Sequence, residues 1–178
     1  MEETFRLRGL AWKSRVRDFA APERWEDPED ADSLHWAILH AGKVVAAARL
    51  SLVQSLAETP NAEVYTGVLP DLEGPIGSIN RLVVDPAHAG QGLSQCLDRV
   101  RLAHADAAGA MHVVGRTSAG KSRLNALYAL GFRTAGEARA YTSGPLLQME
   151  TLLETPDLVL IRSITEHRPR HHISDNIS

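Results

Sequence analysis

The 178-residue sequence is poor in cysteine and in long apolar runs. A single cysteine, Cys96, excludes an internal disulfide framework. No apolar run approaches the roughly 18 residues of a membrane-spanning helix, and the first residues, Met-Glu-Glu, do not begin like a signal peptide. We therefore expect a soluble, cytoplasmic protein that has no membrane partner.

The sequence also lacks an excess of positive charge and a metal-ligand motif, which excludes two classes of function. The net charge of −3 gives no reason to expect a nucleic acid as partner. The histidines lack the spacing of metal ligands, so we expect no metal; they include His35, His40, His88 and His112. With 44% hydrophobic residues the chain fits one domain, which we place at residues 1–165, followed by a disordered tail at 166–178.

The hydrophobic patterning predicts a mixed α/β domain. A hairpin is expected at 34–52, around Gly42, after an amphipathic helix at 5–20 and an acidic, solvated connection at 22–33. A long connection at 54–77 precedes the second half of the chain. There we expect helices at 93–108 and 121–130 and strands at 79–84, 111–115, 132–141, 146–153 and 157–164. In the first of these helices, the apolar face should hold Leu93, Cys96, Leu97, Val100 and Ala103.

A loop with two glycines joins the strand at 79–84 to the helix at 93–108. The strand ends at Val84 and an Asp-Pro pair follows, then Ala89-Gly90-Gln91-Gly92-Leu93-Ser94. Backbone N–H groups at the start of a helix favour an anion such as a pyrophosphate, and glycine allows its close approach. The alternative is a simple turn. Neither a nucleotide-hydrolysing P-loop nor a dinucleotide-binding fingerprint matches this spacing.

This stretch resembles the acyl-CoA signature of the GNAT acyltransferase superfamily, a strand ending V-x-P followed by [RQ]-x-x-G-x-[GA]. Val84, Pro86 and Gly92 match it, while Ala89 and Ser94 depart from it. A second segment, 125–132, is similar to the family's helix-to-strand passage ending L-G-F.

The resemblance implies a GNAT-type fold, with a mostly antiparallel central sheet split at a parallel strand pair and flanked by helices. It also implies acetyl-CoA or another acyl-CoA as co-substrate. The backbone of Val83 and Val84 would then hold the pantetheine arm, and the six residues from Ala89 to Ser94 the diphosphate. Lys121, Ser122 and Arg123 are placed to meet the phosphates, unless they form only a solvated polar face.

The catalytic acid and base that the resemblance implies are matched less well by this chain. Asn80 stands where many relatives carry a glutamate, and it can orient water or the acceptor but cannot take a proton. In the resemblance, a tyrosine usually acts as the general acid. Leu127 occupies its position in this chain, and Tyr128 follows one residue later. One residue is about 100° on a helix. We take Asn80 and Tyr128 as the catalytic candidates, with structural roles as the alternatives.

Arg49 and Arg81 each lie within an apolar strand, where a charge needs a partner or a ligand. One alternative is an internal salt bridge, and the other is a carboxylate of the acceptor, which suits the arginine fork. The layout around both arginines also resembles the branch that contains N-acyl amino acid synthases and acyl-homoserine-lactone synthases. In that branch the donor is a longer acyl-CoA or an acyl carrier protein.

The sequence thus predicts an N-acyltransferase that moves an acyl group, with acetyl as the first choice, from acyl-CoA to a primary amine of a small metabolite. The first alternative is synthesis of an N-acyl amino acid or an acyl-lactone signal from a longer donor. The second is a degenerate domain that binds CoA or a partner without catalysis. The sequence leaves open whether the chain forms a homodimer.

Overall fold

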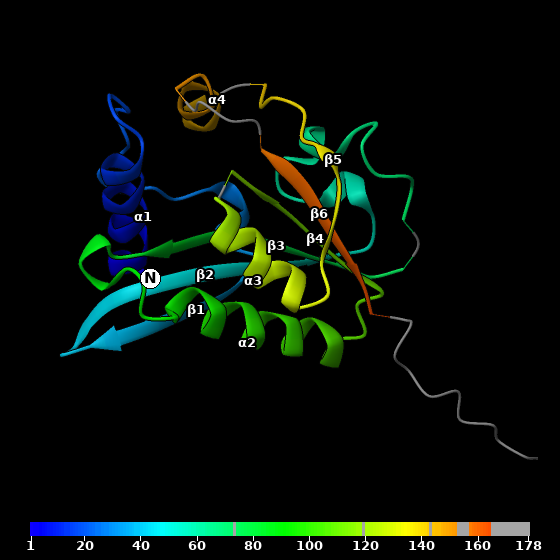
Figure 1. The fold of residues 1–178 in the computed structure, drawn as a ribbon, viewed down its shortest axis with the longest axis horizontal. Helices are drawn as coiled ribbons and strands as arrows, with labels where there is room; N and C mark the ends of the chain where they lie inside the picture. Colours follow the sequence, from blue (N-terminus) through cyan, green and yellow to red (C-terminus); the bar gives the residue numbers. More distant parts are fainter. Residues whose placement is uncertain (73, 119, 143, 153–156, 165–178) are drawn as a thin grey trace, which may run out of the picture.

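The computed structural model describes residues 1–72, 74–118, 120–142, 144–152 and 157–164. Within these ranges one mixed sheet of six strands runs in the order β1-β2-β3-β4-β6-β5 (Figure 1). The strands are β1 (Leu34–His40), β2 (Lys43–Val53), β3 (Ile76–Val84), β4 (His112–Thr117), β5 (Arg133–Glu137) and β6 (Leu158–Ser163). Only β3 and β4 pair in parallel. The predicted fold class is therefore confirmed; the tail at 166–178 lies outside the described residues.

Helices cover both faces of the sheet. They are α1 (Glu2–Arg15), α2 (Leu93–Ala107), α3 (Lys121–Ala129) and α4 (Gly144–Glu150). Helices α2 and α3 lie together on one face, and α1 stands at the β1–β2 side of the molecule (Figure 1). The opposite face of the sheet packs against the long connection after β2, which contains the short helices η2 (Leu56–Glu58) and η3 (Ala62–Tyr65). No described helix has the length and apolar character required to cross a membrane.

The β1–β2 hairpin forms as predicted because its two-residue turn has the required chemistry. Ala41 and Gly42 both have positive φ, +49° and +78°, as a type I′ turn demands. The turn closes the pair His40–Lys43, and the hairpin runs back to Leu34 opposite Leu50.

A β-bulge in β3 changes which side chains face α1. Three residues of β2 lie opposite four of β3, because Ala47 pairs with Val83 but Arg49 pairs with Asn80. The extra residue is Arg81, which has a φ of +50°. The bulge shifts the alternation of side chains along β3, so that Val83 packs with Leu7 and Ala47 under α1.

Two expectations about helices and strands were wrong. Residues 146–153 were expected to form a strand, but α4 occupies Gly144–Glu150, with Leu146 and Met149 buried three residues apart on one helical face. The buried face of α2 also differs from the apolar face expected, since Cys96 and Ala103 are exposed. Leu97, Leu102 and Ala105 are buried there with Asp98 and Arg101, which neutralise each other.

The acidic connection at 22–33 is also not the solvated segment expected. Within it, η1 (Pro28–Asp30) is held against the sheet by a buried ion cluster, which we define as Arg8, Asp27, Asp30, Arg49 and Arg81. Asp30 accepts hydrogen bonds from Arg8 at 2.7 and 2.8 Å and from Arg49 at 2.9 Å. Asp30 is therefore buried, and Asp27 half-buried, because three arginines from α1, β2 and β3 meet them.

The cluster shifts the ionisation of Asp30. Burial by itself would raise the pKa of Asp30, but the hydrogen bonds from Arg8 and the Asp27 N–H, together with the charges of Arg8 and Arg49, hold it below its usual value. A lowered carboxyl pKa contributes stability above the unfolded-state value. That contribution is lost as the pH falls through the folded-state value.

We predict that Asp30→Asn destabilises the protein by about 3–5 kcal/mol, because it removes one of the two carboxylates of the cluster and leaves Arg8, Arg49 and Arg81 to share Asp27. Urea unfolding at pH 7 measures this change. The wild type should also lose stability as the pH drops below about 4, and the variant should lose less.

The matched control is Glu26→Gln, which removes an exposed ion pair with Arg24 in the same segment. Its urea midpoint should equal that of the wild type. Equal midpoints for Asp30→Asn and Glu26→Gln would contradict a stabilising role for the cluster.

Candidate active site

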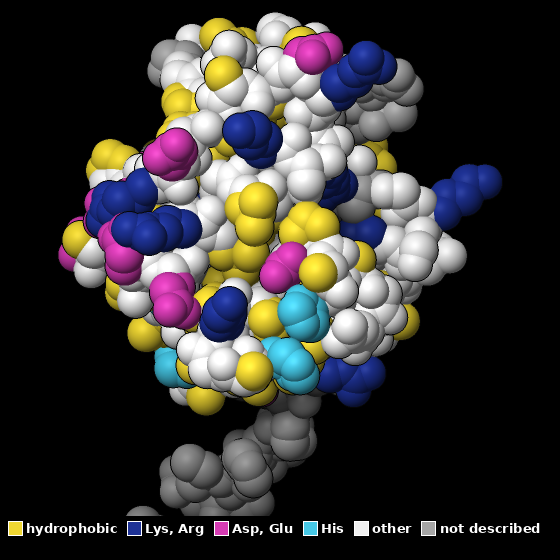
Figure 2. Space-filling view, turned by 90° about the vertical axis from the view of Figure 1, so that its left-hand side faces the viewer, with side chains coloured by type: hydrophobic (Ala, Val, Ile, Leu, Met, Phe, Trp, Pro, Cys, Tyr) yellow, Lys and Arg dark blue, Asp and Glu magenta, His cyan; other side chains and the backbone are white. Residues whose placement is uncertain are grey.

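The parallel strands β3 and β4 part along their length. They pair from Ile76 opposite His112 to Ile79 opposite Gly115, and beyond that point β3 continues to Val84 along β2 alone. A cavity of about 890 Å³ opens at this parting. Its walls come from α1, β3, the loop before α2, the end of β4 and the start of α3. Figure 2 shows the face that carries α1, where basic and acidic side chains surround hydrophobic ones.

The glycine loop forms one end of the cavity. Every residue predicted there lines it, from Ala89 to Ser94. Gly90 and Gly92 have φ of +78° and +76°, and a Cβ on either would meet no heavy atom within 4 Å. Gly92 is the N-cap of α2 and gives it no side-chain cap, so N–H groups of the first turn lack a partner inside the helix. This is the geometry of an anion site.

The start of α3 adds polar and basic groups to the same cavity. Ser118, Gly120, Lys121, Ser122 and Arg123 all line it. Arg123 reaches across to Asp98 of α2, which also pairs with buried Arg101. Ser122, predicted to meet the cofactor, is therefore placed in the same cavity as the glycine loop.

Arg101 holds the bulged part of β3 in place. Its Nη1 donates to the carbonyl oxygens of Arg49 at 3.1 Å and Asn80 at 3.2 Å, next to the register shift between β2 and β3. Burial lowers the pKa of Arg101 to about 10, although Asp98 opposes this shift. The guanidinium is still a cation at neutral pH.

Asn80 lines the cavity, but its amide is already engaged. The side-chain oxygen accepts from Arg49 Nε, and the nitrogen donates to the Ser78 carbonyl at 3.2 Å and hydroxyl at 3.3 Å. The structure thus places Asn80 at the site as a well-fixed group.

The two candidate arginines have different positions. Arg49 is fully buried in the ion cluster and does not line the cavity. Arg81 does line it, donating to both oxygens of Asp27 and lying 5.3 Å from the Trp25 ring centroid. Both arginines therefore form internal salt bridges, and Arg81 alone of the pair also faces the cavity.

Leu127 and Tyr128 are neighbours in α3 and therefore face different sides of the helix. Leu127 is buried and lines the cavity. Tyr128 is 42% exposed, lies outside the lining, and its hydroxyl is 2.8 Å from Thr134 Oγ1.

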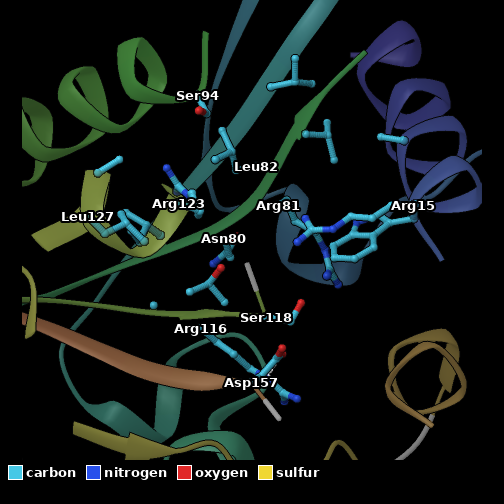
Figure 3. Close-up of a pocket in the computed structure, with 18 of the residues that line it drawn as sticks. Arg15, Asn80, Arg81, Leu82, Ser94, Arg116, Ser118, Arg123, Leu127 and Asp157 are labelled. Atoms are coloured by element: carbon cyan, nitrogen blue, oxygen red, sulfur yellow. Dashed lines mark hydrogen bonds and ion pairs between the residues drawn. The ribbon is translucent and has the colours of Figure 1, made fainter. Parts of the chain in front are cut away.

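Several polar residues of the cavity wall were not singled out from the sequence as site residues. Arg15, at the end of α1, lies over the Trp12 ring, while Arg116, Tyr141 and Asp157 gather where β4 ends and β6 begins. Figure 3 shows Arg15 and Arg81 on the α1 side, and Arg116, Ser118 and Asp157 along another wall. No local motif marks these residues, because they come together only through the sheet order.

A comparison with known families agrees with this geometry. Residues 2–132 match the Acetyltransferase (GNAT) family. The chain belongs to this family.

Solved structures share the GNAT fold at low identity. The ribosomal-protein-S18-alanine N-acetyltransferase from Escherichia coli has a TM-score of 0.56 at 15% identity, covering 88% of this chain and 86% of that one. FeeM, an N-acyl amino acid synthase from uncultured soil microbes, reaches 0.62 at 10% identity, covering 92% and 84%. The AHL synthase LasI reaches 0.61 at 15% identity, covering 91% and 81%. No curated protein sequence is significantly similar to this GNAT chain.

We predict that Gly92→Ala raises the Kd for acetyl-CoA about 10- to 100-fold, because the added Cβ stands in front of the amides that would bind the diphosphate. Calorimetric titration measures it. Gly42→Ala is the matched control, since Gly42 has nearly the same φ, equally open surroundings and no place in the cavity. The same Kd for both variants would contradict the anion site.

We also predict that Tyr128→Phe leaves kcat unchanged, since the hydroxyl lies against Thr134 outside the cavity lining. Steady-state release of free thiol measures kcat. Thr134→Val is the control that removes only the partner of this hydroxyl. A large fall in kcat for Tyr128→Phe, absent in Thr134→Val, would give the tyrosine the role of acid that the family resemblance implies.

Proposed function

We propose that this GNAT protein transfers an acyl group from acyl-CoA to the primary amine of a small metabolite, by direct attack within a ternary complex. One observation carries the proposal: the parted edge of β3 and the open amides of the glycine loop line a single cavity. Its volume lies within the range of small-molecule and cofactor sites, about 300–1,000 Å³.

Acyl-CoA would lie with its diphosphate on Gly90 to Ser94 and near Ser122, all of which line the cavity. Its pantetheine arm would pair with the backbone of Val83 and Val84, which β4 leaves unpaired on that side. A main-chain N–H aimed at the thioester oxygen would polarise the carbonyl. We assign Asn80 a positioning role, because its amide is fixed between Arg49 and Ser78.

The cavity also supports an acceptor that carries a carboxylate. The ion cluster sets three guanidinium groups against the carboxylates of Asp27 and Asp30, with Glu29 at 4.0 Å from Arg49. Of the three arginines, Arg81 lines the cavity and can face a carboxylate there. Arg15 adds a second cation from α1. Arg49, which does not line the cavity, would hold Asp27 and Asn80 in place.

Synthesis of an N-acyl amino acid or acyl-lactone signal is therefore the second candidate function. Besides Arg15 and Arg81, it is favoured by the apolar side chains that line the cavity, which include Trp12, Leu82, Leu146, Met149 and Leu160. A longer acyl-CoA, or an acyl carrier protein bearing the same pantetheine arm, would be the donor.

We expect acetyl-CoA to bind and, with an acceptor from a panel of small amines and the twenty common amino acids, to yield amide and free CoA thiol. Calorimetric titration with acetyl-CoA, octanoyl-CoA and free CoA, followed by a thiol-release assay, tests this. A preference for octanoyl-CoA together with amino acid acceptors would select the second candidate function.

Binding without turnover of any acceptor would indicate a degenerate CoA-binding domain. Failure of all three CoA species and of octanoyl acyl carrier protein to bind would overturn the proposal.

A further inference from the structure

Most of the charged side chains that line the cavity are cationic. The described lining residues include Arg15, Arg81, Arg101, Arg116, Lys121 and Arg123, but Asp157 is the only carboxylate among them. An acyl-CoA and an acceptor carboxylate both suit such a wall. An ammonium group does not, except beside Asp157.

Asp157 is held firmly at the start of β6. Its backbone carbonyl accepts the Ala138 N–H at 2.9 Å, which continues the β5–β6 pairing, and its neighbour Leu158 pairs with Thr117 of β4. The residue is 7% exposed. Asp157 therefore lies beside the end of β4, near the point where β3 and β4 part.

The two carboxylate oxygens of Asp157 differ. Oδ2 accepts from Arg116 Nε, whereas Oδ1 is buried and has no hydrogen-bond partner among the described residues. A buried acceptor without a donor costs about 1–3 kcal/mol. An ammonium group that reached this oxygen would remove that cost.

Arg116 does not need Asp157 as its counter-charge. Glu150 of α4 already pairs with Arg116 Nη2, and its other oxygen accepts the Tyr141 N–H at 2.8 Å. Glu150 does not line the cavity. Arg116 thus has two carboxylates, of which Glu150 uses both oxygens within the protein and Asp157 has one oxygen without a partner among the described residues.

We propose that Asp157 binds the ammonium group of the acceptor and receives its proton. This assignment rests on the proposed function and adds the residue that selects the amine. The Arg15 and Arg81 side chains line the same cavity (Figure 3). An acceptor carrying both an ammonium and a carboxylate, such as an α-amino acid, therefore finds a counter-charge for each.

The transfer balances with these groups. The ammonium gives one proton to Asp157 Oδ1, and the neutral amine attacks the thioester carbon, forming the C–N bond. Collapse of the tetrahedral intermediate breaks the C–S bond. The second amine proton passes through water to the leaving thiolate, giving free CoA thiol, and Asp157 releases its proton to solvent.

The test compares Asp157→Asn with Glu150→Gln, since each removes one negative partner of Arg116. The donor is octanoyl-CoA or acetyl-CoA, whichever the wild type prefers, and the acceptor is the amino acid with the highest wild-type turnover. We expect Asp157→Asn to lower kcat/KM for the amino acid about 10- to 100-fold, the size of a lost charge-assisted hydrogen bond. The Kd of the acyl-CoA should not change.

Two further measurements separate acceptor binding from a structural role. Asp157→Glu should restore part of the activity. The aminooxy acid counterpart of the same amino acid, whose amine is uncharged at pH 7, should lose much less with Asp157→Asn than the amino acid does.

Equal losses in Asp157→Asn and Glu150→Gln, or equal losses for the charged and the uncharged acceptor, would overturn the assignment and leave the proposed function intact. If the wild type binds acyl-CoA but acylates no amino acid, the assignment to amino acid acceptors fails. If it binds no acyl donor, the proposed function itself fails.

Discussion

The site depends on one constraint: β3 must leave β4 after Ile79 while it stays paired with β2. A strand with one open edge exposes N–H and C=O groups that need partners. The bulge at Arg81 and the guanidinium of Arg101 allow this, since Arg101 binds the carbonyls of Arg49 and Asn80 from the α2 side. The remaining open edge is then available to a ligand that pairs as a strand would.

Two buried ion networks brace β3 from opposite faces. On the α1 face, the ion cluster ties the α1–β1 connection to β2 and β3 through Asp27 and Asp30. On the other face, Asp98 links Arg101 of α2 to Arg123 of α3. Removing one member of such a network leaves a buried charge, which is far costlier than losing an exposed pair. Both networks therefore hold β3 in the arrangement in which it lines the cavity.

The sequence predicted the features that arise locally. The glycine loop and the hairpin turn at Gly42 each follow from a few adjacent residues. Tyr128, a catalytic candidate from the sequence, lies outside the cavity lining, and its neighbour Leu127 lies in it. Arg49 and Arg81 were correctly marked as needing partners. Their partners, Asp27 and Asp30, lie in a segment that reads as a solvated loop, and only the fold brings them together. The same holds for Arg116 and Asp157, which are 41 residues apart.

The distribution of charge around the cavity favours the acyl donor at one end and the amine acceptor at the other. A polyanionic donor is favoured by the amides of the glycine loop and by the cations at the start of α3. Asp157 is the one carboxylate among the described lining residues, and there we place the ammonium group of the acceptor. If donor and acceptor bind as proposed, their opposite charges direct each to its own end. The carbonyl carbon and the amine then meet where β3 and β4 part, and little further catalytic machinery is needed beyond proximity and proton transfer.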